Sequence, residues 1–220
     1  MQTIQEERRT RSNQRIKSMG IACFEDLPML ESSSQVQLKS IDEICKRAIA
    51  CLISTQVACD IQNDDYEESV KFFKPFLEKF SASDDLNYLE QKIFSGNYSE
   101  QDVIDTGWEY EAYWSLVWAL GLIDDISDAS DICDCEKAIS FIRDKENFEE
   151  FKNQCQLRDI EEILDMLDLF YRYHWATVEK RVNPETPIGN LIPGVVVERR
   201  RGLEWLISEE DDWHDISLDT

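Results

Sequence analysis

The residues of this chain that could do chemistry are a few carboxylates and histidines, beginning with Glu109 and Glu111. Both stand at the entrance of an apolar stretch, where a partly buried carboxylate can acquire the raised pKa that acid–base catalysis uses. They lie two positions apart, roughly 200° around a helix, so they cannot share one ligand. Glu109 is predicted to form a helix cap with Thr106. Glu111 is predicted to pair with Arg172 or with an arginine of 199–201, because buried charges are normally paired.

Histidine occurs at two positions only, His174 and His214. His174 falls on an apolar helical face, so a hydrogen-bonded core residue is the ordinary interpretation and a catalytic or ligand-binding role is the alternative. Glu111 and His174 are therefore the candidate catalytic residues. His214 stands beside Asp215 near the end of the sequence. The two histidines do not form a His-Glu-x-x-His spacing or a comparable one, so we predict no metal site.

The remaining patterns do not indicate a cofactor. The acidic stretch 124–136 lacks the central glycine and the closing glutamate of an EF-hand loop, and its Asp131 is predicted to cap the next helix. Cys133 and Cys135 stand two apart without a second pair, which is weak evidence for zinc. The seven cysteines have no framework spacing, so we expect reduced thiols. Neither a phosphate-binding glycine loop nor a nucleophile elbow is present, and no cofactor is predicted.

The scaffold that must position these residues is predicted to centre on the stretch 106–123. From Ala112 onward this stretch is apolar all round except for Ser115, so a helix here must be surrounded by other elements. With about twelve apolar residues it is shorter than the roughly twenty that cross a bilayer. We therefore predict a helix buried in protein, with Gly121 near its end.

Apolar residues at helical spacing predict the elements around this helix. We expect a peripheral basic helix within 1–20, an amphipathic helix over 41–60, and a long apolar seam over 157–182 that packs on the central helix. A loop rich in proline and glycine spans 183–194 and leads into a last helix. The sequence contains no convincing run of alternating strand residues. The predicted fold is all-α, with residues 1–220 forming a single-domain irregular helical bundle.

Charge limits the partners of this protein. The net charge of −23 repels phosphate backbones and anionic membranes, so we expect neither direct nucleic-acid binding nor membrane binding. The acidic runs 124–136 and 209–219 are ordinarily solvated faces, and the alternative is a docking surface for a basic protein. The charged N-terminal residues lack the apolar core of a signal peptide, and we expect a cytoplasmic protein.

Three segments together resemble a known bacterial family: Trp-Glu-Tyr-Glu-Ala-Tyr-Trp from 108, Tyr-Arg-Tyr-His-Trp-Ala from 171, and Gly-Val-Val-Val-Glu-Arg-Arg-Arg-Gly from 194, followed by Trp-His-Asp at 213–215. The family is catalogued as domain of unknown function 4272, and the similarity extends from about Arg11 to the C-terminus. The resemblance implies a cytoplasmic, helical bacterial protein and supplies no activity. It directs attention to polar and aromatic positions as candidate ligand-binding residues: Arg172, Trp175, Arg199, Trp205 and Asp215. The family pattern commonly has a basic residue where this chain has Glu109.

Two functions are compatible with these observations. The first is a non-catalytic binding or interaction protein whose acidic surface meets a basic protein partner, because catalytic signatures are missing and the negative charge is high. The alternative is a hydrolase-type enzyme with a polar pocket formed by Glu111, His174 and Arg199. The arginines at 199–201, the densest positive patch beyond the N-terminal segment, would in that case hold an anionic group.

Overall fold

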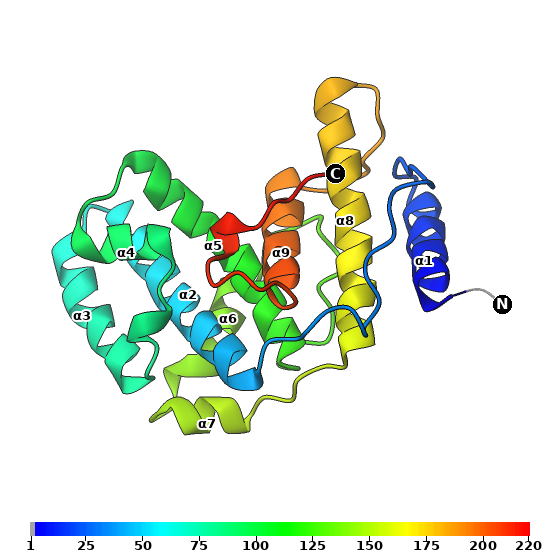
Figure 1. Ribbon diagram of the computed structural model, residues 1–220. Coiled ribbons are helices and arrows are strands. Elements are labelled where there is room, and N and C mark those ends of the chain that lie inside the picture. Colours follow the sequence, from blue (N-terminus) through cyan, green and yellow to red (C-terminus); the bar gives the residue numbers. More distant parts are fainter. Residues whose placement is uncertain (1–2) are drawn as a thin grey trace.

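A computed structural model describes residues 3–220 of the chain (Figure 1). The described residues contain helices and no strand, and the elements are α1 (Ile4–Ser18), α2 (Ile41–Ile61), α3 (Tyr66–Lys79), η1 (Ser83–Asp85), α4 (Tyr88–Ser95), α5 (Glu100–Ala119), α6 (Cys135–Arg143), α7 (Phe148–Asn153), α8 (Ile160–Val182), α9 (Pro193–Trp205) and η2 (Trp213–Asp215). None of the described helices combines the length and the apolar character that crossing a membrane would require. The prediction of an all-α fold is confirmed.

The helices follow one another across the molecule in an order that differs from their order in the chain (Figure 1). Helix α5 lies in the middle and packs against α2 on one side and α9 on the other. The far side of α2 is covered by α3 and α4, while α8 covers the far side of α9 and α1 covers α8. The bundle around a buried central helix is therefore confirmed.

Helix α5 is interior because its sequence has no polar face in its second half. Every residue from Glu109 to Leu120 is buried. The predicted start at Thr106 is wrong, since the helix begins two turns earlier, where Ser99 and Asp102 form the capping box. The helix stops at Ala119 because Gly121 adopts a left-handed φ of 74° beyond it.

The close contact between α5 and α9 depends on a glycine. A Cβ atom at Gly202 would lie 2.6 Å from the carbonyl oxygen of Ala112, so no side chain fits between the two backbones. At the same crossing, Ser115 Oγ donates a hydrogen bond of 2.9 Å to the carbonyl of Arg199. The single polar residue of the apolar stretch therefore joins the central helix to the last helix.

The sequence predicted that the long helix α8 packs on α5, and this prediction is wrong. Helix α8 lies between α9 and α1, and its apolar seam faces these two helices. The physical reason is that α2 and α9 already cover α5, so α8 forms the next layer. The basic helix α1 is peripheral, as expected, and Arg8 ties it to α8 through Glu161 at 2.6 Å and Asp165 at 3.1 Å.

The loop and tail predictions are confirmed in part. The breaker-rich segment 183–192 joins α8 to α9, and α9 begins at Pro193, where a proline costs no helical hydrogen bond. Helix α6 is capped by Asp134 and not by Asp131, because the acidic segment becomes helical only after residue 134. After α9 the chain returns across α4 and α5, and Trp213 is fully buried there.

Candidate functional site

Glu111 and Arg199 form a buried ion pair, with Arg199 Nε 2.9 Å from the Glu111 carboxylate. The other oxygen of Glu111 accepts the backbone N–H of Cys133 at 2.7 Å. The guanidinium of Arg199 also donates to the carbonyls of Ile126, at 3.0 Å, and Asp131, at 3.2 Å. All these contacts hold the acidic loop between α5 and α6 against the bundle. The predicted pairing of Glu111 with an arginine is confirmed, and the pair is saturated by internal partners.

The other residues predicted to bind a ligand are dispersed over the bundle. Arg172 is buried and makes two 2.9 Å hydrogen bonds to Asp168, one turn earlier in α8. Trp175 is half-buried and lies 5.7 Å from the ring of Phe24. Trp205 is buried, with its indole N–H donating to a backbone carbonyl in the segment after α9. Asp215 is exposed to solvent. These side chains do not converge.

His174 is buried in α8, with 7% of its surface exposed, as a core histidine would be. Arg200 Nη1 donates to its Nδ1 at 2.7 Å, so in the neutral ring the proton lies on Nε2. Burial, reinforced by the charges of Arg200, Arg181 and Arg201, lowers the pKa of His174 to about 4. His174 is therefore a neutral hydrogen-bond donor at pH 7.

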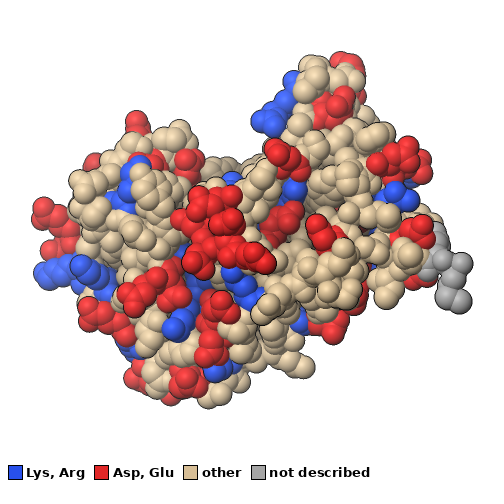
Figure 2. Space-filling view, viewed as in Figure 1, with Lys and Arg blue, Asp and Glu red and all other residues tan. Residues whose placement is uncertain are grey.

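The described residues do not bring Glu111, His174 and Arg199 around one cavity, so the predicted pocket is wrong in its membership. His174 instead lines a cleft of about 670 Å³ between α4, α5, α8, α9 and η2. Figure 2 shows the molecule hollowed beside the projecting C-terminal end of α8. We call this the histidine cleft because both histidines of the chain line it, together with Trp108, Arg181, Glu198 and Arg201.

The second histidine, His214, is held by a carboxylate in the interior. Its Nε2–H donates to Glu109 Oε1 over 2.6 Å, and the side chain of Glu109 is completely buried. The same oxygen accepts Asn87 Nδ2 at 2.8 Å and Trp213 Nε1 at 3.2 Å. The imidazole is 27% exposed, and its Nδ1 has no hydrogen-bond partner among the described residues. The carboxylate therefore fixes the orientation of the ring and leaves one nitrogen free at the cleft.

This carboxylate also changes the acidity of the imidazole. Burial by itself lowers the pKa of His214, but the hydrogen bond and the negative charge of Glu109 outweigh it and raise the pKa above its ordinary value. The two histidines of one cleft thus differ in acidity in opposite directions. Such a divergence is typical of sites that use one group as an acid or base and another as a neutral donor.

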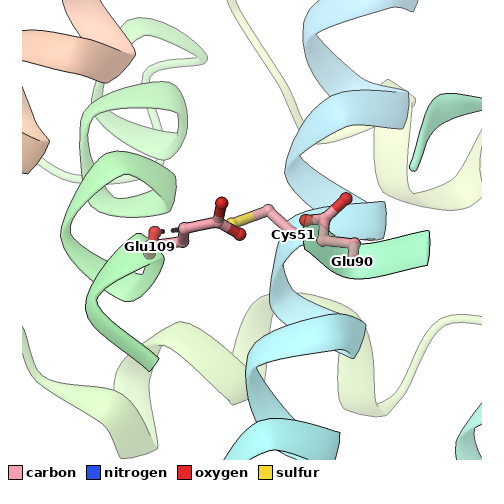
Figure 3. Close-up of side chains that lie close together, drawn as sticks. All are labelled: Cys51, Glu90 and Glu109. Carbon is pink, nitrogen blue, oxygen red and sulfur yellow. Dashed lines mark hydrogen bonds between the residues drawn. The ribbon is translucent and has the colours of Figure 1, made fainter. Parts of the chain in front are cut away.

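Behind Glu109 lies a buried cluster with a second carboxylate. Figure 3 shows Cys51 of α2, Glu90 of α4 and Glu109 of α5 pointing toward one another, with ligand atoms within 4.8 Å. Arg47 forms an ion pair with Glu90, and its guanidinium stacks 4.6 Å from the ring centroid of Trp213. Burial raises the pKa of the Cys51 thiol well above its ordinary value, so this side chain is protonated. A divalent ion fits poorly here because a guanidinium already supplies the positive charge and the thiol is not a thiolate.

The histidine cleft has a cationic end. Arg181, in the last turn of α8, is exposed and forms no ion pair with any other described residue. Arg201 pairs with Glu198 at 3.0 Å within the wall. The arginine charges that disfavour protonation of His174 also favour an anion at the same place. The lining as a whole holds two arginines and two carboxylates, Asp105 and Glu198, so the positive charge is confined to the end of the cleft at Arg181.

The opposite wall of the cleft is aromatic. Trp108 is 39% exposed although α5 is buried from the next residue onward, and Tyr88 of α4 is 64% exposed. A Cβ atom at Gly194 would lie 2.9 Å from the ring of Trp108, so the glycine at the start of α9 leaves room for the indole to approach that helix. A planar ring bound in the cleft would contact these aromatic side chains on one side and be open to solvent on the other.

Sequence reasoning did not find Glu109 and His214 as partners. The segment Trp213-His-Asp carried a signal, because it belongs to the pattern on which the family resemblance rests. Glu109 was assigned to a helix cap, and a residue assigned to a cap is not considered further as a site residue. The segments that begin at 108, 171 and 194 contribute Trp108, His174 and Gly194 to the same cleft.

Comparison with known proteins identifies a family for the chain but no activity. A family model described as "Domain of unknown function (DUF4272)" matches residues 8–216. Neither the curated proteins nor the solved structures contain a match to this chain.

Proposed function

Since the chain belongs to the DUF4272 family, whose description names no activity, we propose from its geometry that it binds a small organic anion carrying a planar ring in the histidine cleft. The observation that supports this most is the meeting of an unpaired arginine, a neutral histidine donor and an exposed tryptophan around one cavity in a strongly acidic protein. We also propose that the protein is bacterial and cytoplasmic, as its resemblance implied.

The roles of the residues follow from their chemistry. Arg181 supplies a charge-assisted hydrogen bond to a carboxylate or phosphate group. His174 donates its Nε2–H, since Arg200 occupies Nδ1. Trp108 and Tyr88 contact the ring, and such stacking contributes on the order of 1 kcal/mol beyond the buried area. The anionic end would thus lie near α8 and the ring near α4 and α5.

A titration with matched ligands tests this proposal. Phenyl phosphate and benzoate are compared with benzylamine, with tryptophan fluorescence and calorimetry as readouts. The anions should bind and the amine should not, and added salt should weaken the anions because Arg181 is exposed. Equal or tighter binding of benzylamine would contradict the proposed preference of the cleft for anions.

Two variants locate the site on the structure. Arg181→Gln removes the cation of the cleft and should weaken phenyl phosphate about tenfold, as expected for one charge-assisted hydrogen bond. Lys180→Gln removes the same charge from the neighbouring residue, whose ammonium hydrogen-bonds the carbonyl of Pro184 outside the cleft. If the two variants weaken binding equally, only the total charge matters and the cleft is not the site.

A second candidate function is the docking of a basic protein partner. Figure 2 shows acidic side chains gathered near the middle of one face, where the C-terminal segment crosses it. A separate cleft of about 500 Å³ is lined by the carboxylates of Glu43, Asp84, Asp85, Asp211 and Asp212. Such a surface would neutralise a basic protein as an immunity protein or a nucleic-acid mimic does. Capture of partners from the native host at low salt, and their release at high salt, tests this function; no partner at low salt would argue against it.

A further inference from the structure

We infer that the histidine cleft hydrolyses carboxylic esters of the anionic ligands proposed above, with His214 as the general base that activates a water molecule. This inference rests on the proposed function, because the anion must bind before a bond in it can be broken. The chemical class of substrate is a small ester that carries a separate carboxylate and a ring. The first support is the hydrogen bond between His214 and the buried Glu109.

The Glu109–His214 pair has the geometry of an activated base. A carboxylate that accepts Nε2–H leaves the lone pair of Nδ1 available and stabilises the imidazolium that forms when Nδ1 takes a proton. Glu109 is held in turn by Asn87 and Trp213, so the ring has one preferred orientation. Glu109 acts through His214 and does not reach the cleft, which makes it a positioning residue.

Water is the nucleophile that the cleft leaves available. Its described lining contains no serine, cysteine or lysine, and its carboxylates are Asp105 of α5 and Glu198, which is paired with Arg201. The hydroxyl of Thr177 is occupied, since it donates to the carbonyl of His174 at 2.9 Å. A base without a neighbouring side-chain nucleophile activates water directly.

The reaction balances with these groups alone. Water transfers a proton to Nδ1 of His214 while its oxygen bonds to the ester carbonyl carbon. The negative charge that develops on the carbonyl oxygen is stabilised by the Nε2–H of His174, which stays neutral, while Arg181 holds the separate carboxylate of the substrate. The carbon–oxygen bond to the alcohol then breaks, and the imidazolium returns its proton to the leaving oxygen. The products are a carboxylic acid and an alcohol, without a change in oxidation state.

The experiment uses the full chain and the monoester 4-nitrophenyl succinate, which combines a carboxylate, an aromatic ring and an ester bond. Release of 4-nitrophenol is followed by absorbance, and the rate should saturate with substrate. His214→Gln should lower kcat by at least about 100-fold with little change in KM, because general-base catalysis contributes roughly 10²- to 10⁴-fold. Asp215→Asn, at the exposed neighbour, is the matched control and should leave kcat unchanged.

The pH profile distinguishes positioning from a structural role. The rate should rise with pH as the imidazole of His214 loses its proton. In Glu109→Gln the charge that raises the pKa of His214 is gone, so the rising limb should shift to lower pH. A merely structural role for Glu109 would lower the rate without moving the limb. This variant and His174→Gln also keep the test decisive if His214→Gln does not fold.

Binding is measured separately with N-(4-nitrophenyl)succinamic acid, the amide analogue of the same ester. If the analogue does not bind, the proposed anion site itself fails. If it binds and the ester is hydrolysed no faster than by the same concentration of free imidazole, the hydrolytic inference is overturned and the binding function stands. A His214→Gln protein as fast as the unmodified chain overturns it equally.

Discussion

Replacement of Gly202 by alanine tests the central packing of the bundle. The added Cβ would lie 2.6 Å from the carbonyl oxygen of Ala112 and 3.1 Å from the Cβ of Ser115. Cβ atoms in folded proteins do not approach a backbone oxygen so closely. Because the contacted atom belongs to the backbone of a buried helix, it cannot rotate away, and α9 must shift from α5. The substitution therefore introduces a steric clash at the α5–α9 contact that keeps α5 in the interior.

Two effects of opposite sign set the magnitude. Overpacking of a filled interface costs about 1–3 kcal/mol. Alanine is better than glycine inside a helix by about 0.5–1 kcal/mol, which offsets part of that cost. We expect a net loss of about 1–2 kcal/mol in the free energy of unfolding. For a chain of this size, that loss corresponds to a fall in Tm of roughly 2–8 °C.

Urea unfolding followed by circular dichroism measures this loss, with Gly107→Ala as the matched control. Gly107 also lies inside a helix, but its added Cβ would come no closer than 3.7 Å to another residue, the side chain of Gln62. That variant should gain about 0.5–1 kcal/mol from helix propensity alone. If Gly202→Ala is stabilised as much as Gly107→Ala, the close approach of α5 and α9 is incorrect.

Three further predictions concern the residues around the site. Burial lowers the pKa of His174 to about 4, so its contribution to stability is complete above the unfolded pKa of about 6.5 and is lost as the pH falls toward 4. His174→Gln should remove this pH dependence of the free energy of unfolding, which amounts to at most about 3 kcal/mol. Urea unfolding midpoints measured across that pH range test it. Arg199→Leu should cost about 3–5 kcal/mol because it strands Glu111, and a double-mutant cycle with Glu111→Leu should recover part of this loss. Gly194→Ala should weaken phenyl phosphate binding by displacing Trp108 into the cleft, with unfolding midpoints measured alongside to separate this from global destabilisation.

The fold was predictable where one physical signal dominated. An apolar stretch without a polar face has to be interior, and the sequence from Glu109 to Leu120 is indeed buried in full. The partner of α8 was not predictable in the same way. An apolar seam indicates that some other element packs on it but does not identify that element. Here α1 and α9 pack on it, because α2 and α9 already enclose α5. Which helix meets which depends on the whole set of faces, and no single segment contains that information.

The start of α5 shows how local rules compete. Ser99 with Asp102 and Thr106 with Glu109 both have the spacing of a capping box, and only the second pair has the glutamate of the usual pattern, which is why the sequence pointed to Thr106. The first pair forms the cap, with a 3.2 Å hydrogen bond from the Asp102 N–H to Ser99 Oγ. The carboxylate of Glu109 has another role, since it accepts hydrogen bonds from Asn87, the N-cap residue of α4, and from His214 of η2, which lies 105 residues further along the chain. A contact of that separation leaves no periodic trace in the sequence.

The charges of this cluster explain why the base at the cleft is linked to the core. Glu90 and Glu109 are both buried, and Arg47 supplies only one permanent positive charge beside them. A buried cluster is most stable when it is neutral, which favours one more proton, and Glu90 and His214 are the two groups of raised pKa that can hold it. Burial, against the opposing charge of Arg47, raises the pKa of Glu90, and the charge of Glu109 raises that of His214. The imidazole of His214 is therefore connected through Glu109 to a charged network that reaches from the cleft to α2. A substitution of Arg47 should change the pKa of this imidazole although Arg47 does not contact it.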